Sequence, residues 1–187
     1  MGLNLVAETV DFDPWVKYNA KAGRWYIKGD DGNEKEVDKP TFVADMANIK
    51  TGWILFLEGQ APSKEFDPSL EQMLPKPSDA HKRGFQLRLF SGKSFGGVVE
   101  LCSSSMHLCK AIAALYTEYE ANAKDGQVPV VEYTGSTGMK DKMGTNYAPN
   151  FKIVKYVDRP AEFDATAEPE VAAPTPASVE VSDDDLF

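Results

Sequence analysis

Short alternating segments separated by turn residues constrain the fold of this chain more than any other feature. Residues 84–90 read GFQLRLF and residues 23–29 read GRWYIKG, so that apolar and polar side chains take turns. Because successive side chains of a strand point to opposite faces, this period of two predicts strands with one buried face. Similar short runs, rich in β-branched or aromatic residues and bounded by Gly, Pro, Asn or Ser, occupy residues 52–59, 94–101, 129–135 and 150–157.

One segment has the pattern of a long helix. It begins near Ser103 and ends near Lys124, just before the Asp-Gly pair at residues 125–126. Apolar residues at helical spacing along it predict a stripe that packs on a core: Leu108, Ile112, Leu115 and Tyr119.

The order of these elements predicts a mainly β fold with one helix, in which two strands follow the helix. An antiparallel barrel of about five to six strands, of the OB-fold type and with the helix after the third or fourth strand, has this order. A β-sandwich with one helix fits the same pattern. Residues 41–46, TFVADM, suit either a short strand or a helical turn, and residues 91–94, SGKS, predict a hairpin turn.

The charge of the chain is unevenly distributed. The formal net charge is -9, but residues 161–187 hold eight acidic residues and no Lys or Arg, whereas residues 1–160 hold 21 acidic and 20 basic residues. The acidic segment is also rich in Pro, Ala and Ser, a composition that buries too little apolar surface to offset the entropy of ordering. The sequence therefore predicts a folded domain over residues 1–160 and a disordered acidic tail over residues 161–187.

The residue types needed for a metal centre or a catalytic set are scarce. The chain has two cysteines, Cys102 and Cys109, and two histidines, His81 and His107, too few for a structural zinc site and typical of a protein of a reducing cytoplasm. No run of about 18 apolar residues predicts a transmembrane helix. We therefore expect no metal, no other cofactor, no enzymatic activity and no membrane contact.

Residues 135–145, GSTGMKDKMGT, predict a long flexible connection between two strands. Lys140 and Lys142 lie in this connection, and basic loops of this kind often contact phosphates. An ordinary solvated loop explains the same composition equally well.

The alternating strands predict an outer face that mixes cations with aromatic rings. Strand periodicity places on one face three residues of each of three segments: Arg24, Tyr26 and Lys28; Gln86, Arg88 and Phe90; Lys152, Val154 and Tyr156. Cations that follow phosphates, together with rings that stack on bases, are what single-stranded nucleic acid requires of a protein surface. The alternative is that these rings pack beneath loops or beneath the N-terminal arm.

The chain resembles the single-stranded DNA-binding proteins of bacteriophages. Residues 39–56, KPTFVADMANIKTGWILF, carry part of this resemblance, and the rest lies in the domain order and in the closing DDDLF. The resemblance implies an OB-fold body followed by a flexible acidic tail that ends in an aromatic residue. It also implies that the tail occupies the basic groove of the body in the absence of DNA, and docks on a replication or recombination partner when DNA displaces it.

The outer strand faces and the resemblance to phage single-stranded DNA-binding proteins together predict three sets of site residues. No catalytic and no metal-binding residue is among them. The rings expected to stack on bases are Tyr26, Trp53, Phe90, Tyr147 and Tyr156. The cations expected at phosphates are Arg24, Lys28, Lys82, Arg83, Arg88, Lys93, Lys140, Lys142 and Lys152. The tail residues expected to dock on a partner are Asp183, Asp184, Asp185, Leu186 and Phe187.

We therefore expect a protein that coats and protects single-stranded DNA without sequence preference during phage DNA replication, recombination or repair. The expected location is the cytoplasm of the infected bacterium, and self-association is compatible with the pattern. Two alternatives stay open. One is an RNA-binding OB-fold protein, which differs by contacts to the 2′-hydroxyl; the other is an interaction scaffold that binds no nucleic acid.

Overall fold

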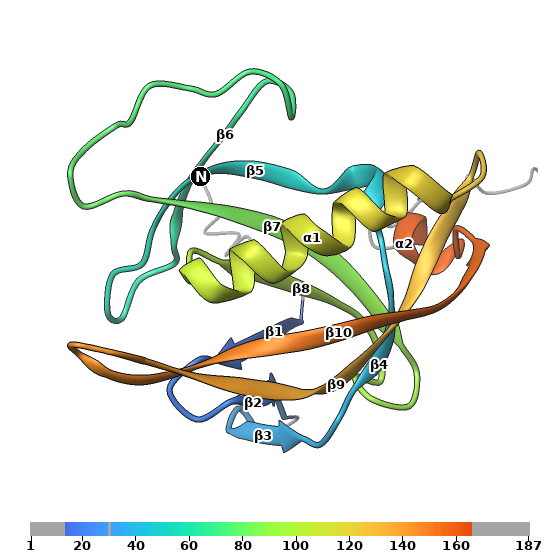
Figure 1. The fold of residues 1–187 in the computed structure, drawn as a ribbon, viewed down its shortest axis with the longest axis horizontal. Coiled ribbons are helices and arrows are strands. Elements are labelled where there is room, and N and C mark those ends of the chain that lie inside the picture. The colour runs from blue at the N-terminus through green and yellow to red at the C-terminus, as the bar shows by residue number, and fades with distance from the viewer. Residues whose placement is uncertain (1–13, 30, 166–187) are drawn as a thin grey trace, which may run out of the picture.

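The computed structural model describes residues 14–29 and 31–165 and contains one long helix against a twisted sheet (Figure 1). Besides this helix, α1 (Met106–Asn122), there are a 3-10 turn, η1 (Met46–Asn48), and a short helix, α2 (Glu162–Ala165). The strands within these residues are β1 (Trp15–Asn19), β2 (Arg24–Lys28), β3 (Glu34–Val37), β4 (Thr41–Ala44), β5 (Lys50–Leu55), β6 (Ser63–Phe66), β7 (Lys82–Ser91), β8 (Gly97–Ser103), β9 (Gln127–Asp141) and β10 (Gly144–Asp158).

The strands form a single mixed sheet that is open rather than closed. Its path runs β10-β9-β4-β7-β8-β1-β2-β3, and β5 pairs with both β6 and β7. Only the β1–β8 pairing is parallel among those described; the others are antiparallel. A mainly β fold with one main helix is thus confirmed. The predicted closed barrel of five to six strands is wrong, because the described sheet has 10 strands.

The structure assigns three further segments for which the sequence made a prediction. Residues 41–46 contain both of the predicted alternatives, because the strand β4 ends at Ala44 and the helical turn η1 begins at Met46. Residues 91–94 lie at the predicted turn between β7 and β8. Residues 135–145 are not a flexible connection, as they form the outer half of a long β9–β10 hairpin that projects beyond the sheet (Figure 1). Polar cross-strand bonds replace apolar packing there: Asn150 Nδ2 donates to Thr137 Oγ1 at 3.1 Å.

The core is centred on the indole ring of Trp25, which is 1% exposed. Its centroid lies 5.3 Å from that of Tyr18, 6.0 Å from that of Phe42 and 5.8 Å from that of Tyr133. Aromatic pairs at such separations and tilted angles add to the stabilisation from burial alone. The strands β1, β2 and β3 form an antiparallel meander. Because the partners of Trp25 belong to β1, β4 and β9, its ring packs this meander against the rest of the sheet.

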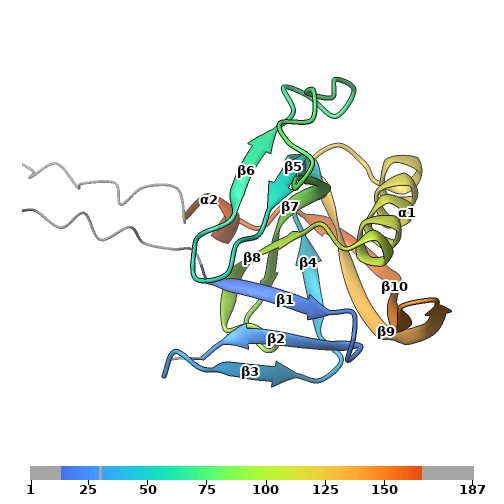
Figure 2. The ribbon, with the colours of Figure 1, turned by 90° about the vertical axis from the view of Figure 1, so that its left-hand side faces the viewer.

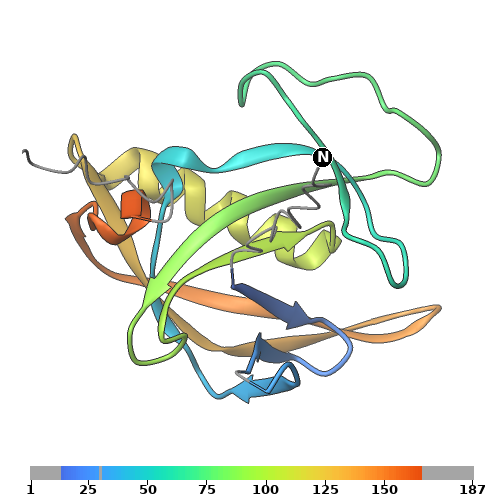
Figure 3. The same ribbon diagram turned by 180° about the vertical axis from the view of Figure 1, so that it is seen from behind.

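The helix α1 completes the core on one side of the sheet. Three members of the predicted stripe, Leu108, Ile112 and Leu115, are buried, and Tyr119 is partly buried. From the opposite side, β7 and β8 pass in front of α1, and β1 continues the sheet beside β8, so that the outer surface of these strands is turned away from the helix (Figure 3). That outer surface is where the sequence places its mixture of cations and rings.

The folded body extends five residues beyond the predicted boundary at residue 160. The ring of Phe163 is fully buried, with 0% of the residue exposed. The guanidinium of Arg159 holds the segment in place, since its Nε and Nη2 donate at 2.8 Å to the two carboxylate oxygens of Asp45, itself 1% exposed. Residues 161–165 are therefore part of the body and not of an acidic tail.

Two glycines allow neighbouring strands to approach closely. Gly52 of β5 and Gly84 of β7 lie directly opposite each other in the ladder. A Cβ atom on Gly84 would lie 2.4 Å from the carbonyl oxygen of Ser103 and 2.6 Å from Cδ1 of Ile54. Both separations are far below van der Waals contact, so the close packing of β5, β7 and β8 requires glycine at this position.

We expect Gly84→Ala to lower the free energy of unfolding by about 1–3 kcal/mol, because the added methyl group overpacks a filled site. Urea denaturation measures the change. Gly92→Ala is the matched control, since a Cβ on Gly92 would have nothing within 4 Å. Equal stabilities of the two variants would contradict the close approach of β7 and β8.

Candidate functional site

The outer faces of four neighbouring strands form one continuous surface. In the ladder, Arg88 of β7 lies opposite Glu100 of β8, and Glu100 lies opposite Trp15 of β1. Lys17 of β1 then lies opposite Tyr26 of β2. Because residues directly opposite each other share a face, these side chains lie on the same side of the β7–β8–β1–β2 surface; Figure 2 shows the β1–β2–β3 meander next to β8.

The alternation predicted for two of the three segments is confirmed. In β2, Trp25 is buried, whereas Arg24 and Lys28 are exposed and Tyr26 is half-buried. In β7, Leu87 and Leu89 are buried, with half-buried residues between them. The structure thus brings residues 24–28 and 86–90, far apart in the sequence, onto one outer surface.

A cation between two aromatic rings is the central feature of this surface. The ammonium nitrogen of Lys17 lies 5.8 Å from the ring centroid of Trp15 and 5.7 Å from that of Tyr26. It also pairs with the carboxylate of Glu34. Such cation–π contacts stabilise a cation at a ring face. Both rings are half-buried and therefore retain exposed area.

Trp15 and Lys17 were not among the predicted site residues. Residues 15–19 read WVKYN, and their alternation of outward Trp15 and Lys17 with buried Val16 and Tyr18 is the same signal that identified β2 and β7. The segment is only five residues long, and its apolar residues fall on both faces, which makes the period of two harder to recognise.

The two predicted cations of β2 differ in their surroundings. The guanidinium of Arg24 donates to both oxygens of the Glu36 carboxylate, at 3.1 and 2.8 Å, and these bonds raise the pKa of Arg24. Lys28 is exposed and has no ion pair with any residue that the structure describes. Lys28 is therefore the cation of this strand that is most available to an anionic ligand.

The β7 end of the surface is occupied by α2. The rings of Phe90 and Phe163 meet edge to face, with centroids 6.3 Å apart. Arg88 Nη1 donates to the carbonyl oxygen of Phe163 at 2.7 Å. Phe90 and Arg88, predicted as a stacking ring and a phosphate contact, are thus engaged by the C-terminal end of the folded body.

Arg83 and Trp53 form a separate cluster that holds the loop after β6. Arg83 donates to both carboxylate oxygens of Asp67, and its guanidinium lies 5.4 Å from the Trp53 ring centroid. The indole nitrogen of Trp53 donates to the carbonyl oxygen of Leu74 at 2.7 Å. Since the hydrogen-bonding groups of these two predicted site residues are already used, they fit a structural role best.

The third predicted face, over residues 152–156, is wrong for Tyr156, whereas Lys152 and Val154 are exposed as predicted. Lys152 pairs with Glu132 and Ile153 with Val131, but a register shift follows, so that Tyr156 pairs with Pro129. An extra residue in one strand turns the residues after it to the other face. Lys152 therefore points outward, whereas Tyr156 lies on the side of α1, where its hydroxyl donates to the carbonyl oxygen of Glu118 at 3.3 Å.

Tyr147 packs against the β1–β2 turn. Its backbone nitrogen donates to the carbonyl oxygen of Ala20 at 2.7 Å, and its own carbonyl oxygen accepts the hydroxyl of Tyr18 at 2.9 Å. The ring is half-buried and lies beside Gly23, where an added Cβ would be 3.1 Å from ring atom Cγ. The residue joins the hairpin to the meander and lies away from the Lys17 cluster.

The remaining predicted cations are exposed but scattered. The tip of the β9–β10 hairpin and the turn between β7 and β8 lie at opposite ends of the molecule (Figure 1). The structure therefore does not gather these five residues into one patch: Lys82, Lys93, Lys140, Lys142 and Lys152. The predicted docking residues Asp183, Asp184, Asp185, Leu186 and Phe187 lie outside the described residues.

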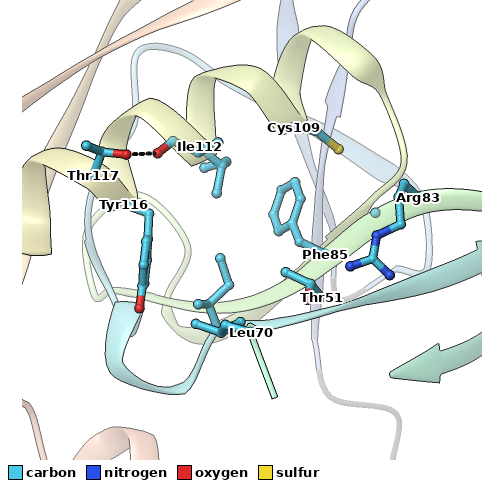
Figure 4. A pocket seen from close by; sticks show the side chains of 11 residues that line it. Thr51, Leu70, Arg83, Phe85, Cys109, Ile112, Tyr116 and Thr117 are labelled. Carbon is cyan, nitrogen blue, oxygen red and sulfur yellow. Dashed lines mark hydrogen bonds between the residues drawn. The ribbon is translucent and has the colours of Figure 1, made fainter. Parts of the chain in front are cut away.

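A second candidate site is an apolar cavity of about 410 Å³ beneath α1 (Figure 4). Phe85 and Thr51 line it from the sheet, Ile112 and Tyr116 from the helix, and Leu70 from the loop after β6. Burial raises the pKa of the Cys109 thiol at its edge, which keeps the thiol neutral and weakly nucleophilic. The lining supplies apolar surface and no acid–base pair.

The part of the chain that the structure describes holds no group of three or more His, Cys, Asp or Glu side chains that could bind a metal ion. Within residues 14–29 and 31–165, no helix has the length and apolar character needed to cross a membrane. Comparison of the chain with family models, with curated proteins and with solved structures found no match.

We expect Asp67→Asn to destabilise the protein by about 2 kcal/mol at neutral pH, because a charge-assisted pair with Arg83 is lost. The Arg83 guanidinium, aided by the Thr51 hydroxyl, holds the pKa of Asp67 well below its usual range. A lowered pKa stabilises the fold above the unfolded-state pKa of about 4 and loses this contribution as the pH falls below it. Urea denaturation measured from pH 7 to low pH should therefore show a smaller loss of unfolding free energy on acidification for the variant than for the wild type.

Asp79→Asn is the control for this measurement, since Asp79 is fully exposed and 3.8 Å from its partner Lys76. It should leave the pH dependence of unfolding unchanged. If Asp67→Asn lost as much unfolding free energy on acidification as the wild type does, the structural role of the Arg83–Asp67 pair would be contradicted.

Proposed function

We propose that this protein binds single-stranded DNA without catalysing a reaction, and that it coats and protects the strand during phage DNA replication, recombination or repair. The observation that carries the proposal is the array of Trp15, Lys17 and Tyr26 on the outer surface, with Lys28 beside it. A flat aromatic surface next to cations suits a ligand with stacked bases and phosphates, and a stack accepts every base.

We also propose that five parts of the sheet correspond to the five strands of an OB-fold: β4 with β5, then β7, β8, β9 and β10. Two features support this assignment. The helix α1 lies between the third and fourth of these parts, and the first part pairs with both the second and the fourth. In OB-folds the surface of the second and third strands binds oligonucleotides. On this assignment that surface is β7–β8, to which the β1–β2 array is joined edge to edge.

The roles of the individual residues follow from their surroundings. Tyr26 and Trp15 would stack on bases, and Lys28 would meet a phosphate. Arg24 would contribute less, because a phosphate must first displace the carboxylate of Glu36. An exposed pair of this kind is held weakly, so that the displacement is feasible.

For the acidic segment after the folded body, we propose the two roles that the resemblance implies. Residues 166–187 hold six acidic residues and no Lys or Arg, and compete with DNA for cations of the body. Leu186 and Phe187 dock in an apolar pocket of a replication or recombination protein. The start of this segment follows α2, which lies against β7 and β8 (Figure 2).

We expect the protein to bind an oligo(dT) strand more tightly than duplex DNA of the same length, with an affinity that falls as salt rises. Tyr26→Ala should weaken single-strand binding by about 1–3 kcal/mol through loss of stacking. Lys28→Gln should reduce the slope of log affinity against log salt by about 1, and Arg24→Gln by less. Fluorescence titration over a salt series measures all three.

Equal affinity for duplex and single strand would refute the proposed function. Normal binding by folded Tyr26→Ala and Lys28→Gln would instead refute the choice of surface. Matched oligo(dT) and oligo(rU) distinguish the alternative of an RNA-binding protein, which requires tighter binding of the RNA.

Deletion of residues 166–187 should raise affinity for single-stranded DNA, most clearly at low salt, because six competing carboxylates are removed. The deletion starts after Ala165 so that the buried Phe163 is retained. Deletion of Leu186 and Phe187 alone should leave DNA affinity nearly unchanged and abolish capture of the replication partner. Unchanged DNA affinity of the longer deletion, or partner binding by the shorter one, would contradict the respective role.

A further inference from the structure

A cavity of about 700 Å³ lies between the β1–β2 surface and the segment that joins β5 to β6. Trp15, Lys17 and Lys28 line it from the strands, and Phe56 and Pro62 line it from the joining segment. In Figure 2 this segment comes down beside the start of β1. The volume falls in the range of about 300–1,000 Å³ that is usual for small-ligand sites.

The apolar part of the cavity is aromatic and partly open to solvent. Phe56 is 50% exposed, a large fraction for an aromatic residue, although it lines a cavity. Trp15 lines the same cavity from β1 and is half-buried. Two rings contributed by different segments to the lining of one cavity suit a flat aromatic ligand that stacks on both.

The charges around the cavity favour an anion. The two carboxylates in the lining are each paired with a lysine, Glu34 with Lys17 and Glu100 with Lys64. Lys28 then remains as a cation without an ion pair among the described residues. The remaining ionisable group is the Cys102 thiol, and burial raises its pKa to about 11, so it adds no negative charge at neutral pH.

We propose that this cavity holds one nucleotide of the bound strand, with its base stacked on Trp15 and Phe56 and its phosphate at Lys28. The inference rests on the proposed function and deepens it, because it turns an open stacking surface into a defined base-binding site. Lys17 lies against both Trp15 and Tyr26, which makes the cavity continuous with the Tyr26 surface. A strand that crosses Tyr26 would therefore place a neighbouring base at the cavity.

The three tryptophans provide a test within the intact protein. Trp15 lines the cavity, whereas Trp25 is buried and Trp53 is bonded to Leu74. In ¹⁵N–¹H spectra, titration with a short oligo(dT) should shift the indole N–H signal of Trp15 and leave that of Trp25 in place. Trp15→Phe assigns the signal and should keep most of the affinity, because a phenyl ring still stacks.

Phe56→Ala should weaken oligo(dT) binding about tenfold and reduce the shift of the Trp15 signal. Leu57→Ala is the matched control, since Leu57 is its neighbour, is 48% exposed and is absent from the cavity lining. It should bind as the wild type does. An unchanged Trp25 signal in each variant verifies that the core is intact.

An oligomer of abasic deoxyribose phosphates separates the base from the phosphate. It should bind weakly and leave the Trp15 signal in place; a shift as large as that with oligo(dT) would overturn the assignment of a base to the cavity. Oligo(dT) binding that weakens in Tyr26→Ala but is normal in Phe56→Ala, with an unmoved Trp15 signal, would overturn the cavity alone. Absence of any oligonucleotide binding by the wild type would overturn the proposed function and the cavity with it.

Discussion

The burial of Trp25 is the constraint on which the outer surface depends. Its ring contacts Tyr18, Phe42, Tyr133 and Phe151, which belong to four other strands. Loss of a ring with so many neighbours would leave a large cavity in the core. Because side chains alternate along a strand, an inward Trp25 forces its neighbours Arg24 and Tyr26 outward. The direction of the candidate site is thus fixed from within the core.

A buried charge imposes a second constraint, at the other end of the same surface. Asp45 is almost inaccessible to solvent, and its ionised form needs partners, which Arg159 and Asn48 supply. The bonds of Arg159 to Asp45 and to Asp164 raise the pKa of Arg159 and keep it charged. These bonds hold the chain after β10 against β7. As a consequence, α2 covers Phe90. The open part of the surface is the part formed by β1 and β2.

Sequence patterns predicted the parts of this arrangement that local periodicity controls. The buried faces of residues 24–28 and 84–90 and the helix over residues 106–122 depend on spacing alone, and they were predictable. Strands β3 and β6 read EKEV and SKEF, and with one apolar side chain each they carry no alternation to detect. Strand number was underestimated because these two strands and β1 were missed and β4 was left ambiguous, and closure was inferred from too few strands.

Other features depend on contacts between distant residues and leave no local signal. The register shift before Tyr156 is set by pairing with β9, and the engagement of Arg83 depends on Asp67, 16 residues away. Phe163 lies in an acid-rich segment of low apolar content, yet its ring fills a site beside Phe90. A single aromatic residue in such a segment was the one available sign that the fold continues past residue 160.

The distribution of charge on the surface limits how it can hold a polyanion. Glu34, Glu36 and Glu100 pair with Lys17, Arg24 and Lys64, so that a polyanion, whether a strand or the acidic tail, must compete with these carboxylates for the cations of the surface. The aromatic contribution of about 1–3 kcal/mol per base then exceeds that of each exposed cation. Exposed ion pairs are weak, so a phosphate can exchange with a carboxylate at small cost. The proposed function therefore depends on unpaired, stackable bases more than on phosphates, since only a single strand could present its bases to Trp15 and Tyr26.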